Sequence, residues 1–211
     1  MKLACFSDTN GLHNNLQIRE DTDVAIFCGD FSVSGNLSDT VDFLSWYGEQ
    51  PAKRKVLVAG EKDLLVEAEP QLFRDFCEKK GIIYLEDDMY VYEGKRFYGT
   101  PRSLSLTKGA FTYNEATLDK FFSRIPKEVD ILISHYPANG ILDRDKGLTI
   151  GSTSLKDKIQ KIKPTLFIFG HNPTNGFSAF DVSRKDKVFC YNVSISGKNN
   201  INDITYISLL A

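Results

Sequence analysis

Long apolar runs are absent from this chain of 211 residues, and no stretch approaches the length of a membrane-spanning helix. The first apolar run, Leu3–Phe6, ends at a serine and an aspartate, far too soon for the core of a secretory signal peptide. We therefore expect a soluble cytoplasmic protein that has no association with membranes.

An excess of one charge sign is also absent. Lysine and arginine total 26 residues, aspartate and glutamate total 28, and the net charge is −2. Because such a balance creates no general field that attracts polyanions, we expect no general nucleic-acid binding. A local basic patch is still compatible with this composition.

Cysteine is scarce, and the chain contains neither a C-x-x-C pair nor a cluster of cysteine and histidine. This absence argues against zinc-finger and thioredoxin-type functions. The four thiols are far apart and most stand in apolar runs, which indicates buried side chains in a reducing compartment. They are Cys5, Cys28, Cys77 and Cys190.

The sequence does have enough apolar residues for a large core. It is 42% hydrophobic and 26% charged, values typical of a globular domain that needs no disulfide or metal for folding. Repeats, low-complexity segments and linkers are absent, so we expect residues 1–211 to form a single domain.

Short apolar runs of strand length recur along the chain and predict strands that are buried on both faces. They are Leu3–Phe6, Val24–Cys28, Val56–Ala59, Ile82–Leu85, Ile131–Ser134 and Leu166–Phe169. Further strands are predicted at Val188–Val193 and Ile204–Leu209, and a hairpin over Met89–Tyr92 and Arg96–Tyr98.

Helical patterns separate these strands. Ser38 or Asp39 is expected to cap a helix that carries Val41, Leu44 and Tyr47. A second apolar stripe is formed by Leu155, Ile159 and Ile162, and Pro70 suits the first turn of a third helix. The mixture predicts an α/β fold in which two packed sheets carry helices on their outer faces.

Polar residues follow the carboxyl ends of five expected strands. Because ligand sites in α/β sheets gather at that edge, we expect these five loops to form one cleft. The loops are Ser7–Gly11, Gly29–Phe31, Gly60–Asp63, Ser134–Pro137 and Gly170–Pro173.

The order of these loops resembles the calcineurin-like metallophosphoesterase superfamily, whose motifs run D-x-H, G-D, G-N-H-[DE], H and G-H-x-H. The resemblance covers nearly the whole chain. It is most specific to the brain-type metallophosphoesterase-domain proteins and their bacterial relatives. The stretches that carry it are Gly29–Phe31, Arg96–Pro101, Ile125–His135 and Lys163–His171. It implies a four-layer αββα sandwich of two mixed sheets flanked by helices, and a pair of divalent metals that activates water against a phosphoester.

Four motif positions keep the residue type of the superfamily: Asp8, Asp30, His135 and His171. The other four positions differ. Asn10 stands where D-x-H has its histidine, Glu61 and Lys62 stand where G-N-H has its last two residues, and Pro173 stands where G-H-x-H ends.

The resemblance assigns Asp8, Asp30 and positions 10 and 173 to the first metal. Asn10 offers only a weak amide ligand and Pro173 offers none, so we expect the first site to be empty.

The second metal retains a complete set of donors. Two histidines and two carboxylates are enough for one divalent ion, whether Mn, Zn, Fe, Ni or Mg. The set is Asp30, Glu61, His135 and His171.

Lys62 has three alternative roles. It could contact phosphate as a point charge, although an ordinary lysine pKa of about 10.4 makes it a poor proton donor. It could instead substitute for the missing cation among Asp8, Asp30 and Glu61, or it could point to solvent. Lys62, Asp8 and Asn10 are our candidates for catalytic residues.

Several loop residues could also contribute to the cleft. His13 could replace the lost ligand, although a capping or surface role is the alternative. Arg102 and Asn139 could line the cleft, and we expect Tyr136 and Asn172 to contact substrate together with Lys62 and Asn10. Each of these could equally be an ordinary loop residue.

Two functions remain in view. The first is weak, single-metal hydrolysis of a phosphoester, most typically a phosphodiester, because a single metal cannot clamp both nucleophile and leaving group. The second is a catalytically inactive relative that binds a phosphorylated ligand or a protein partner, since a fold does not by itself imply an activity.

Overall fold

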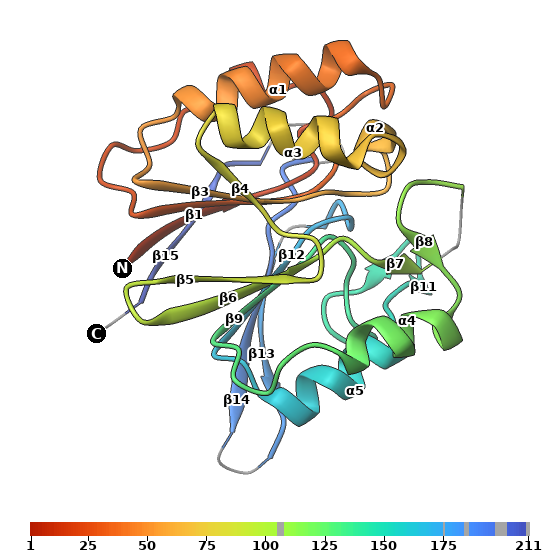
Figure 1. The fold of residues 1–211 in the computed structure, drawn as a ribbon. Coiled ribbons are helices and arrows are strands. Elements are labelled where there is room, and N and C mark those ends of the chain that lie inside the picture. The colour runs from red at the N-terminus through yellow and green to blue at the C-terminus, as the bar shows by residue number, and fades with distance from the viewer. Residues whose placement is uncertain (105–107, 175, 184–185, 197–201, 210–211) are drawn as a thin grey trace.

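The computed structural model describes residues 1–104, 108–174, 176–183, 186–196 and 202–209. Within this part of the chain, two large β-sheets lie face to face between two layers of helices (Figure 1). This arrangement confirms the predicted αββα sandwich.

The first sheet has the strand order β15-β1-β2-β3-β4. Strands β1 to β4 run parallel, and β15 pairs with β1 in the antiparallel sense. The bounds are β1 Lys2–Phe6, β2 Val24–Cys28, β3 Arg54–Val58, β4 Ile82–Tyr84 and β15 Thr205–Ser208.

The second sheet has the order β13-β14-β12-β9-β6-β5. Its four inner strands are parallel, and both edge strands are antiparallel to their neighbours. The bounds are β5 Asp88–Tyr92, β6 Lys95–Thr100, β9 Ile131–Ser134, β12 Leu166–Phe169, β13 Gly176–Asp181 and β14 Lys187–Asn192. Short pairs β7 Ser103–Leu104 with β8 Thr112–Tyr113, and β10 Arg144–Asp145 with β11 Leu148–Thr149, lie outside both sheets.

Helices cover the outer face of each sheet (Figure 1). The first sheet carries α1 Leu37–Glu49, α2 Leu64–Ala68 and α3 Pro70–Lys79, and the second carries α4 Glu115–Ser123 and α5 Thr153–Ile162. A 3₁₀ turn, η1 His13–Asn15, follows β1. Among the described residues, we find no helix with the length and apolarity to cross a membrane.

The cap of α1 differs from the prediction. The helix begins at Leu37, and the Asn36 side chain accepts a hydrogen bond from the Asp39 N–H. The Asp39 carboxylate instead accepts bonds from the preceding loop, including the Val33 and Ser34 N–H groups. Ser38 and Asp39 therefore lie inside the first turn. Pro70 does occupy the first turn of α3, as predicted.

Three apolar clusters hold the layers together. One lies between the first sheet and its helices, one between the two sheets, and one between the second sheet and α4 and α5. Strands β1, β2, β9 and β12 are buried almost throughout, because each sheet is covered on both faces. The sheets are thereby packed so that the carboxyl ends of their central strands meet at one edge of the sandwich.

Candidate metal centre

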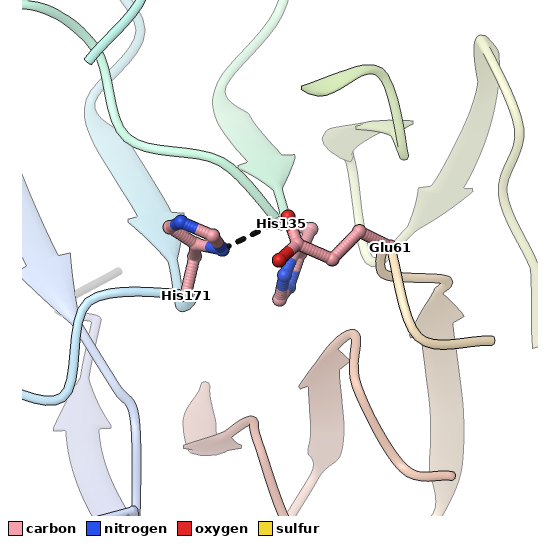
Figure 2. A group of neighbouring side chains, drawn as sticks. All are labelled: Glu61, His135 and His171. Carbon is pink, nitrogen blue, oxygen red and sulfur yellow. Dashed lines mark ion pairs between the residues drawn. The ribbon is translucent and has the colours of Figure 1, made fainter. Parts of the chain in front are cut away.

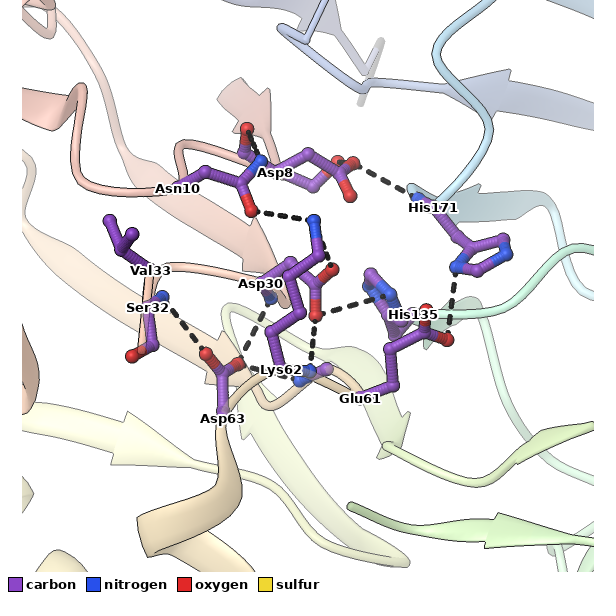
Figure 3. A network of polar contacts seen from close by, with 12 residues as sticks. Asp8, Asn10, Asp30, Ser32, Val33, Glu61, Lys62, Asp63, His135 and His171 are labelled. Carbon is purple, nitrogen blue, oxygen red and sulfur yellow. Dashed lines mark hydrogen bonds and ion pairs between the residues drawn. The ribbon is translucent and has the colours of Figure 1, made fainter. Parts of the chain in front are cut away.

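The loops that follow β1, β2, β3, β9 and β12 bring the predicted site residues together. Asp8, Asp30 and Glu61 come from the first sheet, and His135 and His171 come from the second (Figure 3). Two of these residues are almost completely buried, with Asp30 at 1% and His135 at 0% exposure. The residues that follow these strands therefore come together from both sheets.

The backbone turns sharply at four positions in these loops. Asp8, Asn10, Asp30 and His171 have φ angles of 58°, 43°, 62° and 65°. This left-handed conformation costs a residue with a side chain about 1 kcal/mol or more. Such conformations persist where the surrounding structure holds them, and they are concentrated at functional sites.

Glycines allow the loops to approach one another. A Cβ atom on Gly60 would lie 2.3 Å from Asp30 Oδ1, and one on Gly170 would lie 2.2 Å from Ser7 Oγ. At Gly29, a Cβ would lie 2.6 Å from His135 Nδ1. No side chain fits at these three positions without displacing residues of the site.

Among the described residues, the potential metal ligands form two groups that share His135. Glu61, His135 and His171 form one group (Figure 2), and Asp8, Asp30 and His135 form the other; the ligand atoms of each group lie within 4.8 Å of one another. Asp30 Oδ1 lies 3.5 Å from His135 Nε2, which joins the groups. The four ligands predicted for the second metal are thus adjacent, but Asp30 falls in the group with Asp8.

His135 has the orientation of a metal ligand. Its Nδ1 lies 2.7 Å from the carbonyl oxygen of Cys28, so Nδ1 carries the proton and donates it there. The opposite atom, Nε2, is buried and has no hydrogen-bond partner in the described part of the chain. A carbonyl that fixes one ring nitrogen leaves the other free to bind a cation.

The carboxylates around His135 favour positive charge on its ring or at its Nε2 atom. Burial lowers the pKa of His135, but Asp30, Asp8 and Glu61 outweigh it and raise the pKa to about 9. Burial likewise raises the pKa of Glu61, but the hydrogen bond from His171 and the charges of His135 and Lys62 bring it below its usual value. Glu61 Oε2 lies 3.1 Å from His171 Nδ1. The donor set and its charge therefore fit a divalent cation.

The two aspartates are each held by other groups. Asp8 Oδ2 accepts hydrogen bonds from Ser7 Oγ at 2.6 Å and from the His171 N–H at 3.0 Å. Asp30 Oδ1 accepts the Lys62 N–H at 2.9 Å. These bonds orient both carboxylates toward the cleft, as Figure 3 shows.

Lys62 reaches into the place predicted for the first metal. Its Nζ donates to Asn10 Oδ1 at 2.8 Å and lies 3.5 Å from Asp30 Oδ2. The Asn10 amide also donates to the Asp8 carbonyl at 2.8 Å. The lysine side chain is 49% exposed, so it combines an ion pair with access to solvent. The ion pair with Asp30 is the contact that the substitute-cation role requires, while the exposed part of the side chain is open to solvent.

Asp63 supports the site, although the sequence alone did not single it out. Its carboxylate accepts the N–H groups of Gly60 at 2.7 Å, Asp30 at 3.0 Å and Ser32 at 3.1 Å. It thereby ties the loop after β2 to the loop after β3. The acidic residue that ends the G-N-H-[DE] motif was the available signal.

His13 lies apart from this centre. Its buried ring packs against Phe43 and Trp46 of α1, with centroid distances of 5.4 Å and 5.3 Å. Nε2 lies 3.1 Å from Asp42 Oδ2. His13 belongs to neither metal-ligand group in the described residues, and it is neither a surface residue nor a replacement ligand. The apolar side of α1 accounts for its burial.

The other predicted cleft residues separate into different places. Tyr136 is 1% exposed and its ring lies 4.5 Å from that of His171, so it supports the histidine from behind. The Arg102 guanidinium is occupied by Glu86 and Asp87, at 3.0 Å and 2.7 Å. Neither side chain lines an open cleft.

Asn139 and Asn172 do line a pocket next to the metal centre. Its volume is about 680 Å³. Asn172 follows His171 directly, and its Nδ2 holds the carbonyl oxygens of Leu142 and Arg144 at 2.7 Å and 3.1 Å. The polar side chains that line the pocket are those of Asn139, Asp143, Arg144, Thr149, Asn172 and Thr174.

Comparison with known proteins agrees with this geometry. The model of the calcineurin-like phosphoesterase family matches residues 1–175. Metallophosphoesterase domain-containing protein 1 of Homo sapiens is 30% identical over 196 residues, covering 81% of this chain and 60% of that protein. A UPF0046 protein of Caenorhabditis elegans is 28% identical over 191 residues, covering 81% and 68%.

Solved structures share the fold. The phosphopantetheinyl hydrolase of Mycobacterium tuberculosis superimposes with a TM-score of 0.66 at 12% identity, covering 94% of this chain and 90% of that one. This chain spans about 60% of the length of its human relative. From the family match and the strand-end loops together, we conclude that the chain belongs to the calcineurin-like phosphoesterases, near the metallophosphoesterase domain-containing proteins.

Proposed function

We propose that residues 1–211 form one domain that binds a single divalent metal and hydrolyses a phosphoester weakly. The observation that carries this proposal is the buried Nε2 atom of His135, which has no hydrogen-bond partner among the described residues and lies 3.5 Å from Asp30 Oδ1. Leaving such an atom unpaired is costly unless a cation or proton occupies the place.

The residues that would hold the metal are Glu61, His135 and His171, with Asp30 beside them. A divalent cation held there would supply Lewis-acid charge for a phosphoryl oxygen. Cys28 fixes the His135 tautomer, and Tyr136 packs against His171, so neither ring has to reorient when a ligand binds. Mn, Zn, Fe, Ni and Mg are all compatible with this mixture of donors.

Lys62 and Asn10 would bind the phosphate rather than a second metal. The ammonium is half exposed and lies 2.8 Å from the Asn10 amide oxygen, so it can contact an incoming anion without losing that bond. Asp8 remains near both and completes the negative side of the centre. Without a second cation, stabilisation of the leaving group is incomplete, and we expect slow turnover.

The pocket beside His171 supports a phosphodiester as the substrate. A phosphomonoester has one alcohol group to place, whereas a diester has two. The cavity of about 680 Å³ begins at Asn172 and would accept the second one. Asn139 would contact substrate there, whereas Asn172 is buried and its amide holds the Leu142 and Arg144 carbonyl oxygens.

The test is to count metal and measure hydrolysis in the same preparations. We expect elemental analysis to find about one metal per chain, and a nitrophenyl phosphodiester to be hydrolysed slowly when Mn, Zn, Ni or Mg is supplied. His135→Gln and His171→Gln should each reduce metal affinity at least about tenfold, because each removes a ligand. His13→Gln, which changes the third histidine, should retain the metal.

A second candidate is a non-catalytic domain that binds a phosphorylated ligand or a protein partner. It is favoured by the contacts of Lys62 with Asn10 and Asp30, which already place one positive charge in the centre. Wild-type protein that takes up none of the offered metals, yet binds inorganic phosphate through Lys62, would support this candidate and contradict metal-dependent hydrolysis.

A further inference from the structure

Exposed apolar side chains are gathered on one part of the molecule. Ten large ones are strongly exposed among the described residues, and six of these belong to the loops and helices of the first sheet's outer layer. The six are Leu12, Val33, Leu37, Val41, Leu64 and Leu72. Scattered exposed apolar residues are ordinary on proteins, but a gathering of them indicates a binding surface.

Three of the six lie in, or directly after, the loops that carry Asn10, Asp30 and Lys62. Leu12 is 48% exposed, Val33 is 64% exposed and Leu64 is 47% exposed. Leu12 follows Asn10 by two residues, and Leu64 follows Lys62 by two. Asn10 and Lys62 are thus each followed closely by an exposed apolar residue. We call Leu12, Val33 and Leu64 the apolar wall.

Backbone contacts hold the wall together. The Asn10 N–H donates to the Asp30 carbonyl at 3.1 Å, and the Gly11 N–H donates to the Phe31 carbonyl at 2.9 Å. A Cβ atom on Gly11 would lie 2.7 Å from Val33 Cγ2, so Leu12 and Val33 belong to adjoining loops.

Leu64 adjoins the same surface from the third loop. A Cβ atom on Gly35 would lie 2.7 Å from Leu64 Cγ, which places Leu64 against the end of the loop that carries Val33. The Leu64 N–H also donates to the Lys62 carbonyl at 2.9 Å. The wall therefore continues directly from the groups that would contact phosphate.

We infer that the apolar wall binds an apolar alcohol group of the phosphoester, so that the substrate is an amphiphilic phosphate ester with an alkyl or similar hydrocarbon group. The inference rests on the proposed phosphate site at Lys62 and Asn10. The phosphate anchors the ligand there, and its hydrocarbon part lies over Leu12, Val33 and Leu64. The pocket at Asn172 lies on the His171 side and would receive the other substituent.

The charge of the surroundings favours a single amphiphilic molecule over an anionic lipid surface. The helices next to the wall carry many carboxylates, which repel anionic membranes. These include Asp39, Asp42, Glu67, Glu69, Asp75 and Glu78. A single phosphate ester meets mainly the Lys62 ammonium.

Binding of short and long alkyl phosphates to the full chain tests the inference. Calorimetric titration with methyl phosphate and with octyl phosphate, kept below its micelle concentration, should give at least about tenfold tighter binding for octyl phosphate. Tenfold corresponds to about 1.4 kcal/mol, the burial of about two methylene groups. Octyl glucoside, which has the chain but no phosphate, should bind far more weakly than octyl phosphate.

Matched variants locate the contact. Val33→Thr and Leu12→Ser should together reduce the octyl-to-methyl ratio to about threefold or less, while methyl phosphate binds as before. Val91→Thr is the control, because Val91 is similarly exposed at 58% but lies on β5. The variants change exposed side chains only, and their thermal unfolding should match that of the wild type within a few degrees.

Each outcome decides the matter. A ratio near one in the wild type, with methyl phosphate bound, would overturn the apolar wall and leave the phosphate site intact. Equal binding of octyl glucoside would also overturn it, since the surface would then be a general apolar patch. Absence of methyl phosphate binding, with and without metal, would contradict the proposed phosphate site, and the inference would fail with it.

Discussion

Lys62 is the residue that most distinguishes this centre chemically. Its ammonium lies 3.5 Å from Asp30 and 2.8 Å from Asn10, where the superfamily pattern has a histidine instead. A mobile monovalent charge neutralises carboxylates less completely than a divalent ion does, but it requires no ligand of fixed geometry. A metal bound as proposed would therefore compete with the lysine for the negative charge of Asp30.

This competition predicts the effect of removing the charge. Lys62→Met should increase metal affinity about threefold to tenfold, because Asp30 loses the cation that partly neutralises it. The free energy of unfolding should change by less than about 1 kcal/mol, since the lysine side chain is 49% exposed and such pairs contribute little. Metal titration and urea unfolding measure the two quantities.

Lys62→Arg provides the control, because it keeps the positive charge at a similar reach. Its metal affinity should not rise. If Lys62→Met leaves both metal uptake and stability unchanged, the ammonium is merely solvated and the substitute-cation interpretation is wrong.

At the scale of elements, the site depends on the loops that follow the strands. Certain positions in these loops have no room for a side chain. Gly29, Gly60 and Gly170 each allow a neighbouring site residue to lie where a Cβ would be. Asp63 then fastens the loops after β2 and β3 through three N–H groups. Strand positions determine which loops meet, and the glycines determine how closely they meet.

Gly60→Ala tests this reading of the loops. Its Cβ would lie 2.3 Å from Asp30 Oδ1 and 2.5 Å from Asp30 N, and the latter is held by Asp63. We expect destabilisation by about 2 kcal/mol, typical of an overpacked site, together with loss of metal binding. Gly176→Ala, whose nearest neighbour would be 3.8 Å away, should change stability little. Equal unfolding midpoints for the two variants in urea would contradict this prediction. They would show that the loop after β3 can shift to accommodate the added methyl group.

On the scale of the whole molecule, the centre exists only because two sheets pack against each other. Asp8, Asp30 and Glu61 lie on one sheet and His135 and His171 lie on the other. The apolar cluster between the sheets therefore also positions the potential metal ligands relative to one another. A rebuilt first metal site would likewise draw on both sheets, because Asn10 follows β1 and Pro173 follows β12.

The rebuilt site is the prediction at this scale. Asn10→His and Pro173→His should restore the two lost ligands, and adding Lys62→His should restore a proton donor for the leaving group. Because both metals and the donor act on one transition state, the triple variant should gain far more phosphodiesterase activity than the summed effects of its parts. Elemental analysis counts the bound metals per chain, and hydrolysis of the nitrophenyl phosphodiester measures the activity.

The comparison variants are Lys62→His alone and the double ligand change alone, each of which should gain little. A triple variant that contains two metals per chain but hydrolyses no faster than the parent would contradict our reason for expecting slow turnover.

Local sequence determined the strands with buried faces and the residues that follow them. Runs such as Val24–Cys28 and Leu166–Phe169 match β2 and β12 residue for residue, since both faces are covered and every position must be apolar. The edge strand β13 was missed, because only alternate residues of Gly176–Asp181 are shielded and Phe177 remains 54% exposed. The short helix α2 also gave no periodic signal.

What only the tertiary structure decided is which groups share one point in space. Glu61 and His171 lie more than a hundred positions apart, on different sheets, and their 3.1 Å contact follows from the packing of those sheets. Within the layer of the first sheet, the tertiary structure also buried His13 against α1, placed the Lys62 ammonium on Asn10, and brought Asp30 and Asp8 into one ligand group. Residue types and their order along the chain are local properties, whereas distances between loops depend on the packing of whole layers.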